Sequence, residues 1–147
     1  MKIRIINQQK IKRVSLKRLR KYLKKVSGLL NISSKRISIL LCDNKLIKKL
    51  NKKYLKRNSS TDVIAFPLSD RLEPDYLGEV VVSTEKAAQV ALKLGLRWQD
   101  ELVLYVVHGI LHLLGYDDRT KKKRKILEKK QKNIIGQLEL KSLKIKL

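Results

Sequence analysis

The stretch Trp98-Gln-Asp-Glu-Leu-Val-Leu-Tyr-Val-Val-His-Gly-Ile-Leu-His-Leu-Leu114 predicts a helix whose circumference is mostly apolar. A helix that is apolar on nearly all sides is buried, so we expect this one to lie at the centre of the domain. Its polar residues recur three or four positions apart, which places them in one line along the helix. The line consists of Glu101, Tyr105, His108 and His112.

The two histidines of the chain both belong to this line. Four residues apart on a helix, their imidazoles share one face and can ligate a single ion. Gly115 then ends the helix and returns Asp117 or Asp118 toward that face. The pattern therefore predicts a metal site rather than two core histidines. Two histidines and one aspartate leave a fourth position for water, as in a catalytic zinc site.

The spacing of the histidines also invites comparison with zinc peptidases. Those enzymes carry His-Glu-x-x-His, and the glutamate after the first histidine acts as the general base. Here that position is Gly109. The missing base disfavours peptidase activity.

The charge of the chain is concentrated at its two ends. The 147 residues include 36 Lys and Arg against 13 Asp and Glu, a formal net charge of +23. Residues 1–57 hold 20 basic residues and one acidic residue, and residues 119–147 hold 12 basic residues and two acidic ones. Residues 58–118, in contrast, hold 4 basic residues and 10 acidic ones. Basic flanks favour a polyanion bound through phosphate contacts, and the acidic centre suits a cation. A solvated, lysine-rich surface of the kind found in heat-adapted proteins is the alternative.

Length and composition indicate one domain in a reducing compartment. A chain of 147 residues with 43% hydrophobic residues can bury a single core. Its one cysteine, Cys42, cannot form an internal disulfide. The start of the chain lacks the apolar stretch of a signal peptide, and no segment approaches the roughly 18 apolar residues of a membrane helix. We expect a cytoplasmic location.

Apolar periodicity and turn residues predict strands alternating with helices, followed by helices alone. A helix is expected to begin at Ser83 or Thr84, either of which can cap it, and Gly95 should stop it. An acidic loop is expected over residues 67–77, and a further loop over residues 58–60. The expected strands are 3–7, 37–42, 61–66 and 79–83, and the expected helices are 15–30, 46–54, 84–94, 98–114 and a basic helix and tail from about 119.

The run from His108 to Asp118 resembles the signature of the YbeY endoribonucleases, His-Gly-x-Leu-His-Leu-x-Gly-Tyr-Asp-His. Thr61-Asp-Val-Ile-Ala-Phe-Pro67 and Leu77-Gly-Glu-Val-Val-Val-Ser83 are similar to two strands of that family, in the same order and spacing. The resemblance covers nearly the whole chain and implies a single α+β domain over residues 1–147. It implies a small mixed sheet of about four strands packed with about five helices, the central one carrying the metal-binding histidines.

The resemblance also implies a function. It implies one zinc ion per chain and cleavage of single-stranded RNA in 16S rRNA 3′-end maturation and ribosome quality control. The implied partners are ribosomal RNA or the small ribosomal subunit, a small-subunit ribosomal protein and the GTPase Era.

Two positions depart from the family pattern. The third histidine ligand of the family falls on Asp118, with Asp117 as the alternative, so oxygen donation widens the choice to manganese or other divalent ions. The family has an arginine after its tyrosine where this chain has Leu55. Lys56 and Arg57 follow and are candidates to take over phosphate binding.

These residues predict metal-assisted phosphodiester cleavage, in which Arg57 or Lys56 stabilises charge on the phosphate. Either water or the neighbouring ribose hydroxyl can be the nucleophile. A non-catalytic, zinc-containing rRNA-binding assembly factor and a metal-dependent hydrolase of another substrate are the alternatives. His108, His112 and Arg57 are the catalytic candidates, and the RNA-binding candidates are Lys56, Arg57, Arg119, Lys121, Lys122, Lys123 and Arg124.

Overall fold

The computed structural model describes residues 1–56 and 61–140. Arg57, the expected loop 58–60 and the end of the basic tail lie outside these ranges. The described residues form five helices and four strands, which confirms the α+β class. In chain order the elements are β1 (Lys2–Asn7), α1 (Leu16–Leu29), β2 (Arg36–Cys42), α2 (Asn44–Leu55), β3 (Val63–Pro67), β4 (Tyr76–Ser83), α3 (Thr84–Leu94), α4 (Trp98–Leu113) and α5 (Lys121–Gln137).

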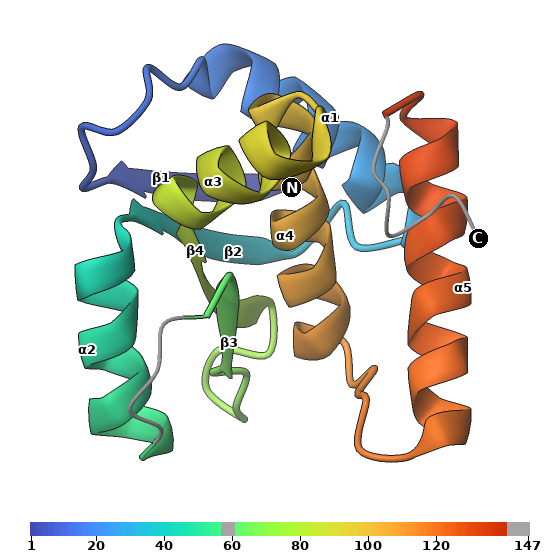
Figure 1. The fold of residues 1–147 in the computed structure, drawn as a ribbon. Coiled ribbons are helices and arrows are strands. Elements are labelled where there is room, and N and C mark those ends of the chain that lie inside the picture. Colours follow the sequence, from blue (N-terminus) through green and yellow to red (C-terminus); the bar gives the residue numbers. More distant parts are fainter. Residues whose placement is uncertain (57–60, 141–147) are drawn as a thin grey trace.

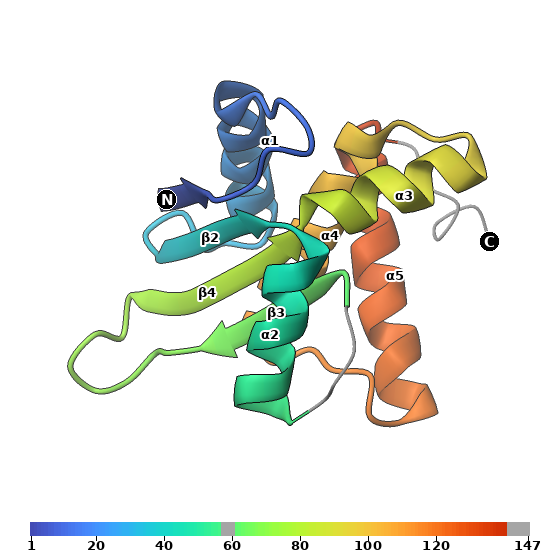
Figure 2. The same cartoon turned by 60° about the vertical axis from the view of Figure 1, so that its left-hand side comes forward.

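The four strands form one mixed sheet in the order β1-β2-β4-β3. Strands β1, β2 and β4 are parallel to one another, and β3 runs antiparallel to β4 at the edge of the sheet. In the register, Ile39 of β2 lies opposite Ile5 of β1 and Val80 of β4. Figures 1 and 2 show α2 alongside β3, with its N-terminal end beside α3, while α4 passes through the middle of the molecule.

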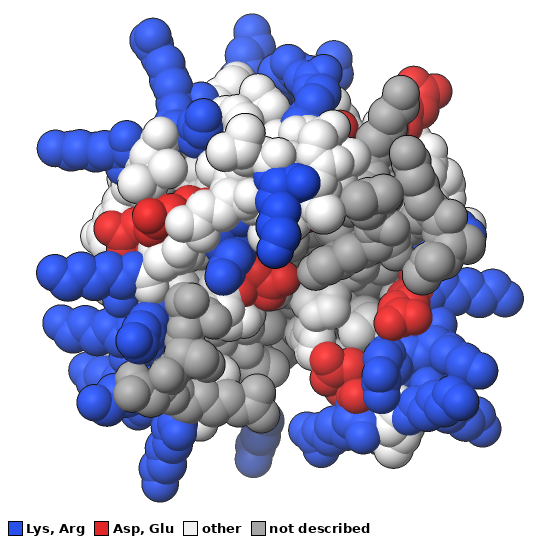
Figure 3. All heavy atoms as spheres, viewed as in Figure 1, with Lys and Arg blue, Asp and Glu red and all other residues white. Residues whose placement is uncertain are grey.

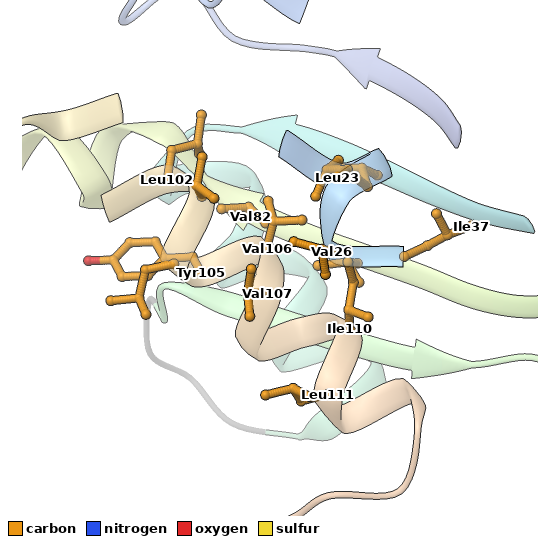
Figure 4. Packing of buried hydrophobic residues seen from close by; sticks show 14 of the residues in the cluster. Leu23, Val26, Ile37, Val82, Leu102, Tyr105, Val106, Val107, Ile110 and Leu111 are labelled. Carbon is orange, nitrogen blue, oxygen red and sulfur yellow. The ribbon is translucent and has the colours of Figure 1, made fainter. Parts of the chain in front are cut away.

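Helix α4 is the centre of the larger core, as its apolar sequence predicts. It packs against α3, β3 and β4, and Figure 4 shows its side chains meeting those of α1, β2 and β4. Val106, Val107 and Leu111 are completely buried. Within the described ranges, no helix combines the length and apolar character needed to cross a bilayer.

The opposite face of the sheet is covered in part by α2. Strand residues alternate between faces, so Cys42 and Val81 point away from α4 and meet Ile47 of α2 and Ile64 of β3. This second cluster is small. Helix α2 therefore borders β3 on the face opposite α4.

Local chemistry sets several of the element boundaries. Ser83 caps α3 by accepting a hydrogen bond from the backbone N–H of Lys86, and Gly95 ends it with a φ of 68°. Both features confirm the prediction. Strand β4, however, begins at Tyr76, three residues before the predicted start, and it includes Gly78 at a φ of 138°. The acidic, proline-containing segment 67–77 was predicted as a loop, yet the pairing with β2 extends back to Tyr76 through a register shift, which shortens the loop.

Candidate functional site

The structure brings the two histidines of α4 together. Both side chains are half-buried, and their Nε2 atoms lie 3.0 Å apart, with ring centroids at 4.6 Å. Zinc binds histidine nitrogen at about 2.0–2.1 Å, so an ion can contact both Nε2 atoms at this separation. The donor pair formed by His108 and His112 therefore fits a metal ion.

Helix α5 supports the first of these histidines. The Nδ1–H of His108 donates a hydrogen bond to Oε1 of Gln131, at 2.7 Å. Gln131 is buried on α5, which packs against α4. The sequence interpretation missed this residue, although a signal was present: Gln131 falls midway between Leu127 and Ile135, at the spacing of the buried edge of a lysine-rich helix.

The surroundings of His112 keep its ring neutral. Burial lowers the pKa of His112, and the neighbouring His108 lowers it further, whereas Asp118 and Asp117 act in the opposite direction. A metal ligand must be the neutral imidazole, because the protonated ring has no free lone pair. The lowered pKa thus keeps His112 competent as a ligand.

The two aspartates after α4 are placed differently. Oδ1 of Asp117 accepts the backbone N–H of Arg119 at 3.1 Å, and its Oδ2 lies 3.6 Å from Nζ of Lys123. The bond from Arg119 is the main cause of a lowered pKa of Asp117. Asp118 is exposed in the same loop. Over residues 1–56 and 61–140, no three His, Cys, Asp or Glu side chains form a metal-holding group, so the third ligand stays a prediction.

The other half of the polar line on α4 is closed off from solvent. Glu101 and Tyr105 are both buried, at 1% and 2% exposure. Burial raises the pKa of Tyr105, as do the charge of Glu101, the charge of Asp62 and a hydrogen bond with Glu101. The phenol of Tyr105 therefore stays protonated and donates a hydrogen bond to Glu101. Of the four residues in the line, the histidines are the pair that reaches solvent.

Gly109 faces the sheet rather than the site. A Cβ at this position would lie 2.5 Å from Cγ1 of Val80 and 3.1 Å from Cγ2 of Val63. A glutamate cannot occupy position 109 without displacing α4 from β3 and β4. The geometry thus supports the sequence inference that the peptidase base is missing here.

The described basic residues expected to bind RNA lie at the C-terminal end of α2 and around the N-terminal end of α5. Lys56 ends α2 with a left-handed φ of 57° and is exposed, while Arg57 lies outside the described residues. Figure 3 shows Lys and Arg side chains gathered over α2 and over the lower part of α5. We use the name α5 cluster for the predicted RNA-binding cations around the start of this helix. It consists of Arg119, Lys121, Lys122, Lys123 and Arg124, which are all exposed.

Comparisons with known proteins agree with this architecture. The family described as Endoribonuclease YbeY matches residues 4–139. An Endoribonuclease YbeY from Carboxydothermus hydrogenoformans is 40% identical over 104 residues, which cover 71% of this chain and 73% of the relative. Another, from Geobacter sulfurreducens, is 31% identical over 145 residues, 95% of this chain and 97% of the relative.

A solved structure is also similar. The solution structure of TM1509 from Thermotoga maritima superimposes with a TM-score of 0.62 at 26% sequence identity, over 93% of this chain and 91% of that one. With the family matched over residues 4–139 and relatives aligned along most of its length, the chain belongs to the YbeY endoribonuclease family.

Proposed function

We propose that this chain is a metal-dependent endoribonuclease that cleaves single-stranded RNA. The observation that carries the proposal is the 3.0 Å approach of two Nε2 atoms on the solvent-facing part of a buried helix. A pair of converging imidazoles suits a transition metal, and family membership directs the chemistry to RNA.

The ion would be held by His108, His112 and one aspartate, with one zinc ion per chain. Arg119 and Lys123 already engage the carboxylate of Asp117, which favours Asp118 as the third ligand. When bound, a divalent ion supplies a Lewis acid that withdraws charge from a phosphate oxygen and acidifies water. An aspartate ligand also admits manganese or another divalent ion.

The α5 cluster would hold the RNA backbone beside the ion. Thr120 caps α5, and the next four residues are all cations, with no acid in the first turn. Cations at a helix N-terminus oppose the helix dipole at a cost of about 0.3–1 kcal/mol each. A bound phosphate chain would remove that cost. We assign phosphate binding also to Lys56 and Arg57, with Arg57 stabilising charge on the reacting phosphate.

The biological role that we propose follows from the family. It is 16S rRNA 3′-end maturation and ribosome quality control in the cytoplasm. The partners would be ribosomal RNA or the small ribosomal subunit, together with a small-subunit ribosomal protein and the GTPase Era.

A comparison of wild type with the His108→Ala variant tests the activity. The wild-type protein, loaded with zinc, should cut a single-stranded RNA and leave a duplex of the same sequence intact. His108→Ala should lose cleavage while its salt-dependent RNA binding is unchanged. Cleavage by the variant at the wild-type rate would refute the proposal. An RNA with deoxyribose at the cut position would separate the two nucleophiles, because only attack by water tolerates it.

A second candidate function is a non-catalytic rRNA-binding assembly factor that holds zinc for stability. The observation that favours it is the exposed α5 cluster, which can bind RNA phosphates whether or not the metal ion takes part in catalysis. Removal of the metal with a chelator should then lower the melting temperature and leave RNA binding intact, with no RNA cleaved before or after. Metal content measured for wild type, His112→Ala and Asp118→Ala would identify both the ion and its third ligand.

A further inference from the structure

We propose that Gln131 is a positioning residue that holds His108 in the one neutral form able to bind the metal, and so links the docking of α5 to metal affinity. This inference rests on the proposed function, because it concerns the same site. It assigns a role to the C-terminal helix beyond carrying positive charge.

The hydrogen bond itself selects the form of the ring. An amide oxygen carries no hydrogen, so the 2.7 Å contact with Oε1 of Gln131 requires the hydrogen to be on Nδ1 of His108. A neutral imidazole has one N–H, and its other nitrogen therefore keeps a free lone pair. In His108 that nitrogen is Nε2, which faces His112 at 3.0 Å. Partners of this kind commonly orient metal-binding histidines.

The position of Gln131 on α5 is informative because an apolar residue would suit the packing better. Gln131 is 7% exposed, and it lies on the helix edge that buries Leu127, Ile134 and Ile135. Burying an amide costs free energy unless its polar atoms find partners. An amide on this edge is therefore explained by its hydrogen bond to His108 rather than by packing.

A connection between helices follows from this contact. The bond joins α4 to α5 across 23 positions of sequence, so it forms only when α5 is docked. Docking of α5 should therefore raise metal affinity, and by thermodynamic reciprocity the bound metal should favour the docked helix. The same helix begins with the α5 cluster. Metal binding would thus help to place those cations beside the site.

The first test measures zinc affinity by competition with a coloured chelator. Gln131→Leu keeps the size of the side chain and removes the acceptor, and we expect zinc affinity to fall about 10- to 100-fold. Gln131→Glu restores an acceptor for Nδ1–H and should stay close to wild type. Gln137→Leu is the matched control, because Gln137 is exposed on the same helix and, among the described residues, its side chain bonds to Asn133 of that helix.

The second test uses the metal-free protein, so it stands apart from activity and from zinc binding. Nitrogen NMR shifts report which ring nitrogen is protonated. Wild type and Gln131→Glu should show His108 with its hydrogen on Nδ1, whereas Gln131→Leu should show a mixture of both forms. The melting temperature of metal-free Gln131→Leu should match or exceed that of wild type, which separates lost positioning from lost folding.

The outcomes distinguish this inference from the proposed function. If the Gln131→Leu variant bound zinc as tightly as wild type and kept the hydrogen of His108 on Nδ1, the proposed role of Gln131 would be overturned. Failure of wild type to bind zinc, manganese or another divalent ion would refute the proposed function, and the NMR comparison of the metal-free proteins would still decide whether Gln131 positions His108.

Discussion

Replacing Gly109 with alanine tests the packing that sets the position of the histidines. The new Cβ would lie 2.5 Å from Cγ1 of Val80, far inside the roughly 3.5–4.0 Å preferred by carbon atoms, and 3.1 Å from Cγ2 of Val63. Val80 is completely buried. A valine side chain has few alternative rotamers, so it cannot turn away easily. The strain must therefore move α4 relative to the sheet.

Two opposing contributions determine the change in the free energy of unfolding. Alanine is better than glycine inside a helix by about 1 kcal/mol. Overpacking costs about 1–3 kcal/mol, and because the new Cβ meets two stiff valines, we take the cost at this site to be about 3 kcal/mol. The net expectation for Gly109→Ala is a loss of about 2 kcal/mol. For a chain of this size that corresponds to a melting temperature lower by about 6 °C.

Thermal unfolding followed by circular dichroism measures this difference. Gly28→Ala in α1 is the matched control, because an added Cβ there meets nothing within 4 Å. It should stabilise the protein by about 0.5 kcal/mol. In a double-mutant cycle, Gly109→Ala combined with Val80→Ala should lose less than the sum of the two single variants. A melting temperature for Gly109→Ala equal to or above that of wild type would refute the steric explanation.

Two further predictions concern the thiol and the basic surface. Burial raises the pKa of Cys42 to about 12, and the charge of Asp43 adds to this effect. Because the thiolate is the reactive form, a thiol reagent at pH 8 should label the folded protein about 1000-fold more slowly than the unfolded chain. Equal labelling rates in native buffer and in denaturant would contradict this prediction. Replacing Lys121 and Lys122 with alanine should reduce the steepness of log affinity for single-stranded RNA against log salt by about 1.4, whereas the same change at Lys24 and Lys25 of α1 should leave it unaltered. Equal slopes for both double variants would remove the α5 cluster from the RNA-binding surface.

Local features of the chain could be predicted because their causes are local. The apolar pattern of α4 fixes which of its sides are buried, and helix geometry then brings His108 and His112 onto one face. The cap at Ser83 and the stop at Gly95 depend on neighbouring backbone groups alone. Strand β4 was predicted too short, because the acidic segment 67–77 was interpreted as a loop, whereas Tyr76 pairs with Arg36 of β2.

The sequence alone determined the order of the elements, the buried helix and the pair of imidazoles, because each depends on residues a few positions apart. The tertiary structure decided the rest: the antiparallel edge strand, the closeness of Val80 to Gly109, and the bond from His108 to Gln131. Each of these joins separate elements across the fold. The physical reason is that hydrogen bonds and steric contacts between distant residues exist only after the helices and strands have packed, and no local periodicity records where that packing brings them.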